Sequence, residues 1–344
     1  ALRRGEYSTA QHRAETIVGA PALYRLAEVM DLTGFSRDQV TGFMRSMGLP
    51  VPPDDAPVFS VKDIDAMVAA HEVAAYGILG EQTENQLLRA VSHTAERLAW
   101  WQYESLVDDA AARYGLDIDA ARLVVLDNVA DMADIFEDQM AYAWRGHLAR
   151  IIRHVGARAA EVGPEGSGPT PETLPLQRAV GFVDLVGYTA FSAQLGAADL
   201  DLLVQGFMRQ SRDIVARDGG RVVKELGDGI MFVTDEPFRA AEIALDLAAQ
   251  IGTEESTPPA RVGLVWGRVL GRFGDVFGPS VNLASRLCGL AAPAQVLVDE
   301  ATAATLADQA GSVLVLEGQD PVQVSGMGRI KPHRLTRAET ETVK

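Results

Sequence analysis

The chain has 344 residues, of which 47% are hydrophobic and 23% charged, a composition typical of a globular protein with about two folded domains. Its formal net charge of −16 disfavours proteins that bind nucleic acids through a basic surface. No apolar run approaches the roughly 18 residues of a membrane span, the N-terminus lacks a signal-peptide pattern, and the single cysteine, Cys288, excludes an internal disulfide, so we expect a cytoplasmic protein.

Residues 1–158 predict an all-α domain. Apolar residues recur at helical spacing in Ile17–Met30, Leu87–Leu106 and Ile135–Ile152, and the proline-rich stretch Gly48–Asp55 predicts a turn between helices. We interpret this domain as a regulatory or dimerisation domain.

Part of this domain, Tyr24–Met67, has the pattern of a helix-turn-helix motif. A domain that reads DNA needs a basic face, whereas residues 1–150 contain 13 Lys and Arg against 23 Asp and Glu, a balance of −10. The charge therefore favours a regulatory domain over a DNA-binding regulator, which stays as an alternative.

The last helix of the domain is predicted from Asp134 to about Arg158. It carries an apolar stripe that is typical of core packing and would also suit a dimer seam. The stripe consists of Ile135, Met140, Trp144, Leu148, Ile151 and Ile152. Residues 159–177 follow, and the density of Gly and Pro in Gly163–Pro169 predicts a linker there.

Residues 178–338 predict a second domain in which strands and helices alternate. The order β-α-β-β-α-β is typical of a ferredoxin-like α+β fold with a central antiparallel sheet flanked by helices. The predicted elements are the strand Ala179–Leu185, the helix Ala198–Arg217, the strands Arg221–Leu226 and Ile230–Val233, the helix Pro237–Ile251, the strand Arg261–Leu270, the helix Ser280–Leu290 and the strand Gln295–Val298.

Two carboxylates in this domain suggest a metal site. Asp184 is central in the apolar segment Val180–Thr189, which predicts a buried strand that breaks at Gly187. Asp228 lies between two glycines at the tip of a predicted hairpin. Each could be an ordinary residue satisfied by turn amides. On neighbouring strands, however, the pair suits Mg²⁺, which binds one or two carboxylates together with water and phosphate oxygens.

Four further polar residues accompany the carboxylates. Lys224 lies on a strand that should be half-buried, although it could be a surface lysine, and Asp275 could be an ordinary loop residue. Asn282 and Arg286 are four residues apart and therefore share one face of a helix. The planar guanidinium of Arg286 is suited to holding the transition state of a phosphoryl transfer.

Three segments together resemble the signature of the class III nucleotidyl cyclases. They are Phe182–Thr189, Lys224–Asp228 and Asp275–Arg286. The 40 residues between Asp184 and Lys224, and the 47 between Asp228 and Asp275, also suit that family. The resemblance covers roughly residues 178–337 and is strong because all three segments occur in order.

This resemblance implies a catalytic domain that forms a head-to-tail homodimer with active sites at the interface. Asp184 and Asp228 of one chain would bind two Mg²⁺ or Mn²⁺ ions. The reaction would be attack of the ribose 3′-oxygen of ATP on the α-phosphate, which gives cyclic AMP and pyrophosphate.

The other chain would supply the nucleotide contacts. Lys224 and Asp275 would read the base, Asn282 would orient the ribose, and Arg286 would stabilise charge at the α-phosphate. A lysine donates and a carboxylate accepts, which fits adenine. Guanine-specific relatives typically carry Glu and Cys at these two positions, so the resemblance implies ATP as the substrate.

The phosphates would meet backbone amides and basic side chains. The amides are those of Leu185, Val186, Gly187, Tyr188 and Thr189. Arg268 resembles a family arginine that contacts phosphate. Gly326-Met327-Gly328 stands where many relatives have Gly-Lys-Gly, so the residue that binds the terminal phosphate is open, with Arg329 or Lys331 as substitutes.

The helical first domain resembles the regulatory domain of soluble actinobacterial cyclases that are inhibited at neutral pH and activated by acid. Histidine titrates in this range, and five of the six histidines precede the linker. They are His12, His71, His93, His147 and His154. They could equally be scattered structural histidines. The sequence therefore predicts an adenylate cyclase regulated by its N-terminal domain, with protons or a small molecule as the effector. A guanylate cyclase and an inactive cyclase-like nucleotide sensor are the alternatives.

Overall fold

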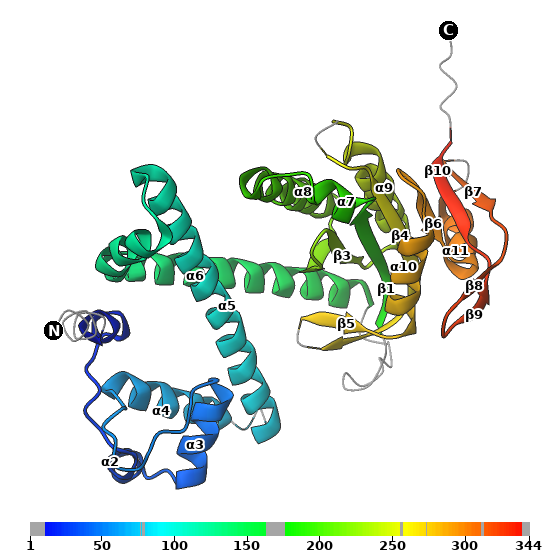
Figure 1. Ribbon diagram of the computed structural model, residues 1–344. Helices are drawn as coiled ribbons and strands as arrows, with labels where there is room; N and C mark the ends of the chain where they lie inside the picture. The colour runs from blue at the N-terminus through cyan, green and yellow to red at the C-terminus, as the bar shows by residue number, and fades with distance from the viewer. Residues whose placement is uncertain are drawn as a thin grey trace. The chain divides into compact units, whose positions relative to one another are not determined.

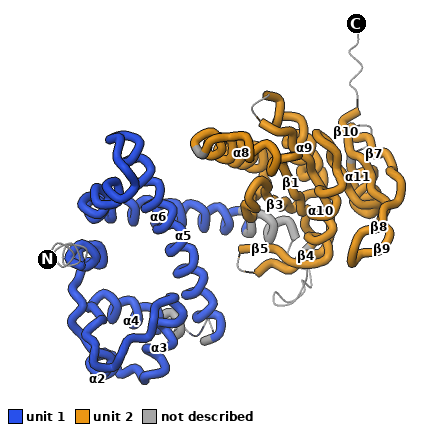
Figure 2. Tube along the Cα trace, viewed as in Figure 1, with its two compact units in different colours: residues 1–166 blue, residues 167–344 orange. Residues whose placement is uncertain are grey.

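The structure is a computed structural model that describes residues 11–75, 77, 80–162, 176–254, 257–272, 274–310 and 313–338. The chain divides into two compact units, residues 1–166 and 167–344 (Figure 2). The division falls inside the segment 159–177 for which a linker is predicted. None of the helices in the described ranges is both long and apolar enough to cross a membrane.

The first unit is helical, as predicted (Figure 1). After a helical stretch at residues 11–18 come α2 (Leu26–Thr33), α3 (Arg37–Ser46), α4 (Val61–Ala75), α5 (Glu81–Tyr114) and α6 (Ile118–Val162). It contains two small cores. Helices α2 to α4 enclose residues such as Val29, Val40 and Phe59, and α5 packs on α6 through Val107 and Val125.

Two predicted helix boundaries are wrong. Ile17–Met30 is not one helix, because Gly19 adopts a left-handed φ of 79° and Pro21 follows, so that a new helix begins only at α2. The helix predicted from Asp134 begins sixteen residues earlier, at Ile118. It also continues to Val162, four residues into the predicted linker, whereas Gly163–Pro169 lie outside the described residues.

The predicted helix-turn-helix motif is formed by α2 and α3. Ser36 caps α3, because its side chain accepts a hydrogen bond from the Gln39 amide. The end of α3 packs on α5. Ser46 Oγ donates to Asn85 Oδ1 at 3.1 Å, and Ser92 Oγ donates to the Met47 carbonyl at 2.6 Å. Helix α5 therefore fixes the C-terminal end of the second helix.

The second unit is built on a twisted sheet in the order β2-β3-β1-β4-β6-β10-β7, with β5 paired to β4. All pairs are antiparallel except β4–β6. The strands of this sheet are β1 (Leu176–Leu185), β2 (Arg221–Glu225), β3 (Gly229–Thr234), β4 (Ala260–Arg272), β5 (Asp275–Phe277), β6 (Val296–Val298), β7 (Leu314–Gly318) and β10 (His333–Arg337). A separate hairpin joins β8 (Val322–Val324) and β9 (Gly328–Ile330). The helices are α7 (Tyr188–Ser192), α8 (Ala197–Arg217), α9 (Pro237–Gln250), α10 (Pro279–Leu290) and α11 (Glu300–Ala310). The predicted α+β class and ferredoxin-like strand order are confirmed.

Different helices pack on the two faces of the sheet (Figure 1). Helices α8, α9 and α11 pack on one face, against residues such as Val183 of β1. Helix α10 packs on the other face, against residues such as Val180. Side chains alternate along a strand, so Phe182 and Asp184 of β1 lie on the α10 face. The candidate site therefore belongs to the α10 face.

Candidate active site

Asp184 and Asp228 lie at the same end of two neighbouring strands. Asp184 is paired in register with Gly229 at the start of β3, and the Leu185 amide donates to the Asp228 carbonyl at 3.3 Å. Burial raises the pKa of the Asp228 carboxyl, and the nearby charge of Asp184 raises this pKa further. Asp228 is thus more than an ordinary turn residue, because its carboxyl shares a partly buried site with a second carboxylate.

This donor set fits a divalent cation completed by a ligand. In the described part of the chain there is no group of three or more His, Cys, Asp or Glu side chains that could enclose a metal. Two carboxylates without further protein ligands suit Mg²⁺, which keeps water and phosphate oxygens in its coordination shell. Asp184 and Asp228 are the residues that could hold such an ion.

The structure adds Arg261, which the sequence interpretation missed. It lies opposite Asp184 in the β1–β4 register, and its Nε donates to Asp184 Oδ2 at 3.0 Å. A second nitrogen of the guanidinium also bonds this oxygen, while Nη1 donates to the Gly289 carbonyl at 3.2 Å. The carboxylate of Asp184 is therefore satisfied by an arginine and not by turn amides. Arg261 places a positive charge beside the two carboxylates.

Lys224 and Asp275 form a direct ion pair, although 51 residues separate them in sequence. Lys224 Nζ lies 2.7 Å from Asp275 Oδ2, and the two side chains are 37% and 24% exposed. The ammonium group also lies 5.9 Å from the centre of the Phe277 ring. Lys224 is paired with Met231, which packs on the α10 side of the sheet. The two predicted base-reading residues are thus adjacent within one chain.

Asn282 and Arg286 both lie on the exposed side of α10, as their spacing predicts. The opposite side of the helix is buried through Val281, Ala284 and Leu287. Among the described residues, the side chains of Asn282 and Arg286 have no hydrogen-bond or ion-pair partner, although the Asn282 backbone amide donates to the Gly278 carbonyl at 3.3 Å. Both groups are therefore free to bind a ligand or a second chain.

Gly263 of β4 fixes how closely α10 approaches the sheet. A Cβ atom at this position would lie 2.2 Å from both the Ala284 carbonyl oxygen and the Cys288 nitrogen, which are backbone atoms that cannot rotate away. We expect Gly263→Ala to displace α10, and with it Asn282 and Arg286. The cost should be about 1–3 kcal/mol of unfolding free energy, as for other overpacked cores.

Denaturant unfolding of the variant measures this effect, and any catalytic turnover should fall with it. Gly271→Ala is the matched control, because Gly271 lies on the same strand and has nothing within 4 Å of its added Cβ. Equal stability of the two variants would contradict the close packing of α10 on β4.

Only some of the backbone amides of Leu185–Thr189, which are predicted to contact phosphate, are free of other hydrogen bonds in the described structure. The Leu185 amide donates to Asp228 and the Val186 amide donates to the Pro259 carbonyl at 2.9 Å. Both donors are thus engaged within this chain, and the phosphate contacts of these two residues stay a prediction. Within the described structure the backbone amides of Gly187, Tyr188 and Thr189 have no hydrogen-bond acceptor outside α7. Helix α7 begins directly after Gly187, which has a left-handed φ of 73°.

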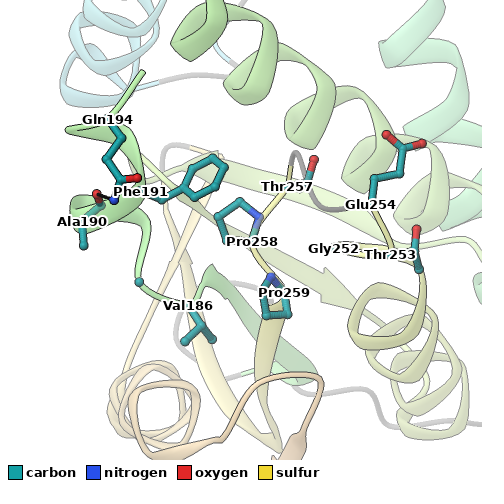
Figure 3. Close-up of a pocket in the computed structure, with 11 residues that line it drawn as sticks. Val186, Ala190, Phe191, Gln194, Gly252, Thr253, Glu254, Thr257, Pro258 and Pro259 are labelled. Carbon is teal, nitrogen blue, oxygen red and sulfur yellow. Dashed lines mark hydrogen bonds between the residues drawn. The ribbon is translucent and has the colours of Figure 1, made fainter. Parts of the chain in front are cut away.

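A pocket of about 550 Å³ adjoins this loop. Val186, Ala190 and Phe191 line one side, and Thr257 and Pro259 line the other (Figure 3). Its lining includes none of the six predicted side chains that would bind metal or nucleotide. This pocket is therefore separate from those six side chains.

Three other predicted phosphate ligands lie away from the carboxylates. Arg268 is exposed on β4, seven residues beyond Arg261, and is paired in register with Gln177 at the far end of β1 from Asp184. Within its own chain it is therefore not beside the two carboxylates. Arg329 and Lys331 are exposed at and after β9. Their contact with phosphate stays a prediction.

Comparison with known proteins gives consistent matches. Residues 177–337 match the family model described as the adenylate and guanylate cyclase catalytic domain. An adenylate cyclase of Glutamicibacter nicotianae is 36% identical over 331 residues, which cover 94% of this chain and 81% of the relative. An adenylate cyclase of Streptomyces coelicolor is 31% identical, over 97% of this chain and 91% of the relative. A pH-sensitive adenylate cyclase of Mycobacterium tuberculosis is 28% identical, over 85% of this chain and 72% of the relative.

Proposed function

Because the chain belongs to the family of adenylate and guanylate cyclases, we propose that it converts ATP into 3′,5′-cyclic AMP and pyrophosphate at a site shared by two copies. The observation that carries this proposal is the Lys224–Asp275 pair, a donor beside an acceptor at 2.7 Å. The adenine edge offers an acceptor at N1 and a donor at N6, so this pair complements it. Guanine offers the opposite pattern on the same edge, so the pair disfavours GTP.

The arrangement on one chain supports a shared site. Asn282 and Arg286 point outward without partners, and the carboxylates lie on the same sheet face. A second copy related by a two-fold axis would bring Asn282 and Arg286 of one chain to the carboxylates of the other, and would do so twice. A head-to-tail homodimer thus has two equivalent sites.

Asp184 and Asp228 would hold Mg²⁺ or Mn²⁺, two ions for each site. When bound, such ions lower the pKa of the 3′-hydroxyl and neutralise phosphate charge. Arg261, already beside Asp184, would contribute a fixed positive charge near the phosphates.

The remaining residues orient the nucleotide and its reacting atoms. Lys224 and Asp275 bind the base, and Asn282 holds the ribose so that its 3′-oxygen is in line with the α-phosphorus. The 3′-hydroxyl loses its proton to solvent and its oxygen forms a bond to the α-phosphorus, while the bond from the α-phosphorus to the bridging oxygen breaks and pyrophosphate leaves. Arg286 donates to the α-phosphate oxygens, whose charge increases in the transition state.

Product formation from ATP and from GTP, each with Mn²⁺, tests the reaction. We expect cyclic AMP from ATP and about five- to a hundredfold less cyclic GMP from GTP, because the partly buried Lys–Asp pair is left with an unmatched donor and acceptor by guanine (about 1–3 kcal/mol). A preference for GTP would establish the guanylate cyclase. Nucleotide binding without either product would establish the inactive sensor.

We also propose that the helical unit inhibits the catalytic unit at neutral pH. The named pH-sensitive relative and the five histidines of this unit support the proposal. His147 is exposed on α6, and His71 packs edge-on against Phe35 with ring centres 5.0 Å apart. The side chain of His154 lies outside the described residues. Protonation of such groups would shift helix packing and thereby the alignment of two catalytic units.

Cyclase activity against pH, with and without residues 1–160, tests this regulation. We expect the full chain to be more active at pH 6 than at pH 8, because histidine is the side chain whose charge ordinarily changes between these values. The shortened chain should lose this dependence. The same pH profile for both proteins would contradict the proposal.

A further inference from the structure

The second half of α6, residues 134–153, belongs to neither of the two cores of the helical unit. The core between α5 and α6 extends along α6 as far as Val129. Beyond it, Trp144 is 63% exposed, and Ile135 and Ile151 are each 57% exposed. A helix in water gains most of its stability from tertiary packing of an apolar face. This segment, which we call the α6 arm, therefore needs a partner along its length.

One face of the α6 arm carries an apolar stripe. Met140, Trp144, Leu148 and Ile151 follow one another at intervals of four, four and three residues, which places them on one side of the helix. Each of these four side chains is at least 40% exposed. The prediction that Ile135 belongs to this stripe is wrong, because nine positions along a helix place it on the opposite side from Trp144. The stripe has the width of a contact with another helix.

The charges of the arm are segregated along its axis. The first turns carry the acidic residues Asp134, Glu137 and Asp138, and the later turns carry the basic residues Arg145, Arg150 and Arg153. In the described part of the chain, none of these six side chains has an ion-pair partner. Two such helices side by side in parallel would place like charges together, whereas two antiparallel helices place acids against bases.

This pattern is complementary to itself, which is the property of a two-fold interface between identical chains. Asp138 and Arg145 are seven residues apart, two helical turns, so they lie on the same flank of the stripe. When two copies of a helix pack antiparallel, the same flank of the stripe faces itself in the two copies. Asp138 of one copy then lies against Arg145 of the second copy, and the reverse contact forms at the same time.

We propose that the α6 arm binds the α6 arm of a second copy in an antiparallel orientation, centred midway between Asp138 and Arg145. The apolar stripe forms the buried seam, and the Asp138–Arg145 contacts select the antiparallel orientation. This interface lies wholly within the helical unit and does not depend on the cyclase reaction.

Association of the full chain tests the seam. Ile151→Glu places a charge in the stripe, and we expect its dimer dissociation constant, measured by analytical ultracentrifugation, to rise at least about tenfold. Ile135→Glu is the matched control, because it changes the same residue type at the same exposure on the opposite side of the helix, and we expect less than a twofold change. Equal effects of the two variants would overturn the proposal.

Charge exchange tests the orientation. Asp138→Arg and Arg145→Asp should each weaken association, because each leaves like charges opposed, and the double variant should restore it. If each single variant weakens association and the double variant weakens it further, the two residues do not meet and the proposed register is wrong.

Distances between spin labels give an independent test. Burial raises the pKa of Cys288, the only native cysteine, to about 12, so labels will attach to introduced cysteines. Tyr142→Cys lies near the proposed centre, whereas Arg153→Cys lies at the end of the arm. In the antiparallel dimer the two labels at position 153 are offset by about 35 Å along the helix axis and those at 142 by almost nothing. Similar label distances at both positions, or no measurable pairing at position 142, would overturn the proposal.

Discussion

Replacing Asp184 with Asn is expected to reduce cyclic AMP formation by about 10³-fold or more. The substitution keeps the size of the side chain but removes the charge that would bind the cation, and cation stabilisation of a phosphoryl transfer is worth several kcal/mol. It also leaves Arg261 without its carboxylate partner, so a positive charge faces Asp228 alone. Mn²⁺ binding, measured by electron paramagnetic resonance in the presence of a non-hydrolysable ATP analogue, should weaken in parallel with turnover.

Asp201→Asn is the matched control for this charge change. Asp201 is exposed on α8, on the opposite face of the sheet, and accepts a hydrogen bond from Gln205 at 2.8 Å. We expect turnover and Mn²⁺ binding within twofold of the unchanged chain. If Asp184→Asn retained normal Mn²⁺ binding, the assignment of this carboxylate to the cation would be wrong.

Replacing Arg286 with Ala is expected to lower kcat by about 10³-fold while ATP binding changes little. The guanidinium would contact charge that develops only in the transition state, so its loss affects the rate more than substrate affinity. The side chain is exposed and has no partner in the described structure, so its removal should not change the unfolding free energy measurably. Arg286→Lys keeps the charge but lacks the two-pronged geometry, and we expect it to recover only part of the rate.

A mixing experiment then distinguishes a shared site from a site within one chain. If Arg286 serves the carboxylates of the other copy, a mixed dimer of Asp184→Asn and Arg286→Ala chains contains one site with both changes and one site with neither. Random mixing of equal amounts should therefore restore about a quarter of the normal activity.

The control for mixing pairs Asp184→Asn with Asp228→Asn. These residues belong to the same side of the site, so every mixed site still lacks one carboxylate and activity should stay absent. If the Asp184→Asn and Arg286→Ala chains also failed to restore activity when mixed, although they associate, the shared site would be refuted.

The motif residues could be located from sequence because they are local features. Asp228 lies between two glycines in a hairpin, and Asn282 and Arg286 lie four apart on a helix, so chain geometry alone places each of them on its element. The same holds for the order of strands and helices in residues 178–338. The start of α6 was missed because only three residues, Gly115 in a left-handed conformation followed by Leu116 and Asp117, separate it from α5.

The contact of Arg261 with Asp184 and the hydrogen bonds of the Leu185 and Val186 amides could not be predicted from the sequence. Both depend on the register between strands. The contact of Arg261 with Asp184 spans 77 residues and exists only because β4 pairs with β1 at these positions. The Val186 amide is used because Pro259, the residue before β4, lies beside it. A shift of β4 by one residue would turn Arg261 to the other face of the sheet.

The sequence by itself determined the two-unit organisation, the strand order and the side chains that could hold a cation and a nucleotide, because periodicity, turn residues and spacing are encoded locally. Only the tertiary structure decided which of those side chains meet. It paired Lys224 with Asp275, placed Arg261 on Asp184, and left the Arg286 side chain and the apolar stripe of the α6 arm exposed. The physical reason is that strand register and helix packing join residues far apart in the chain, and burial of the whole core selects them together.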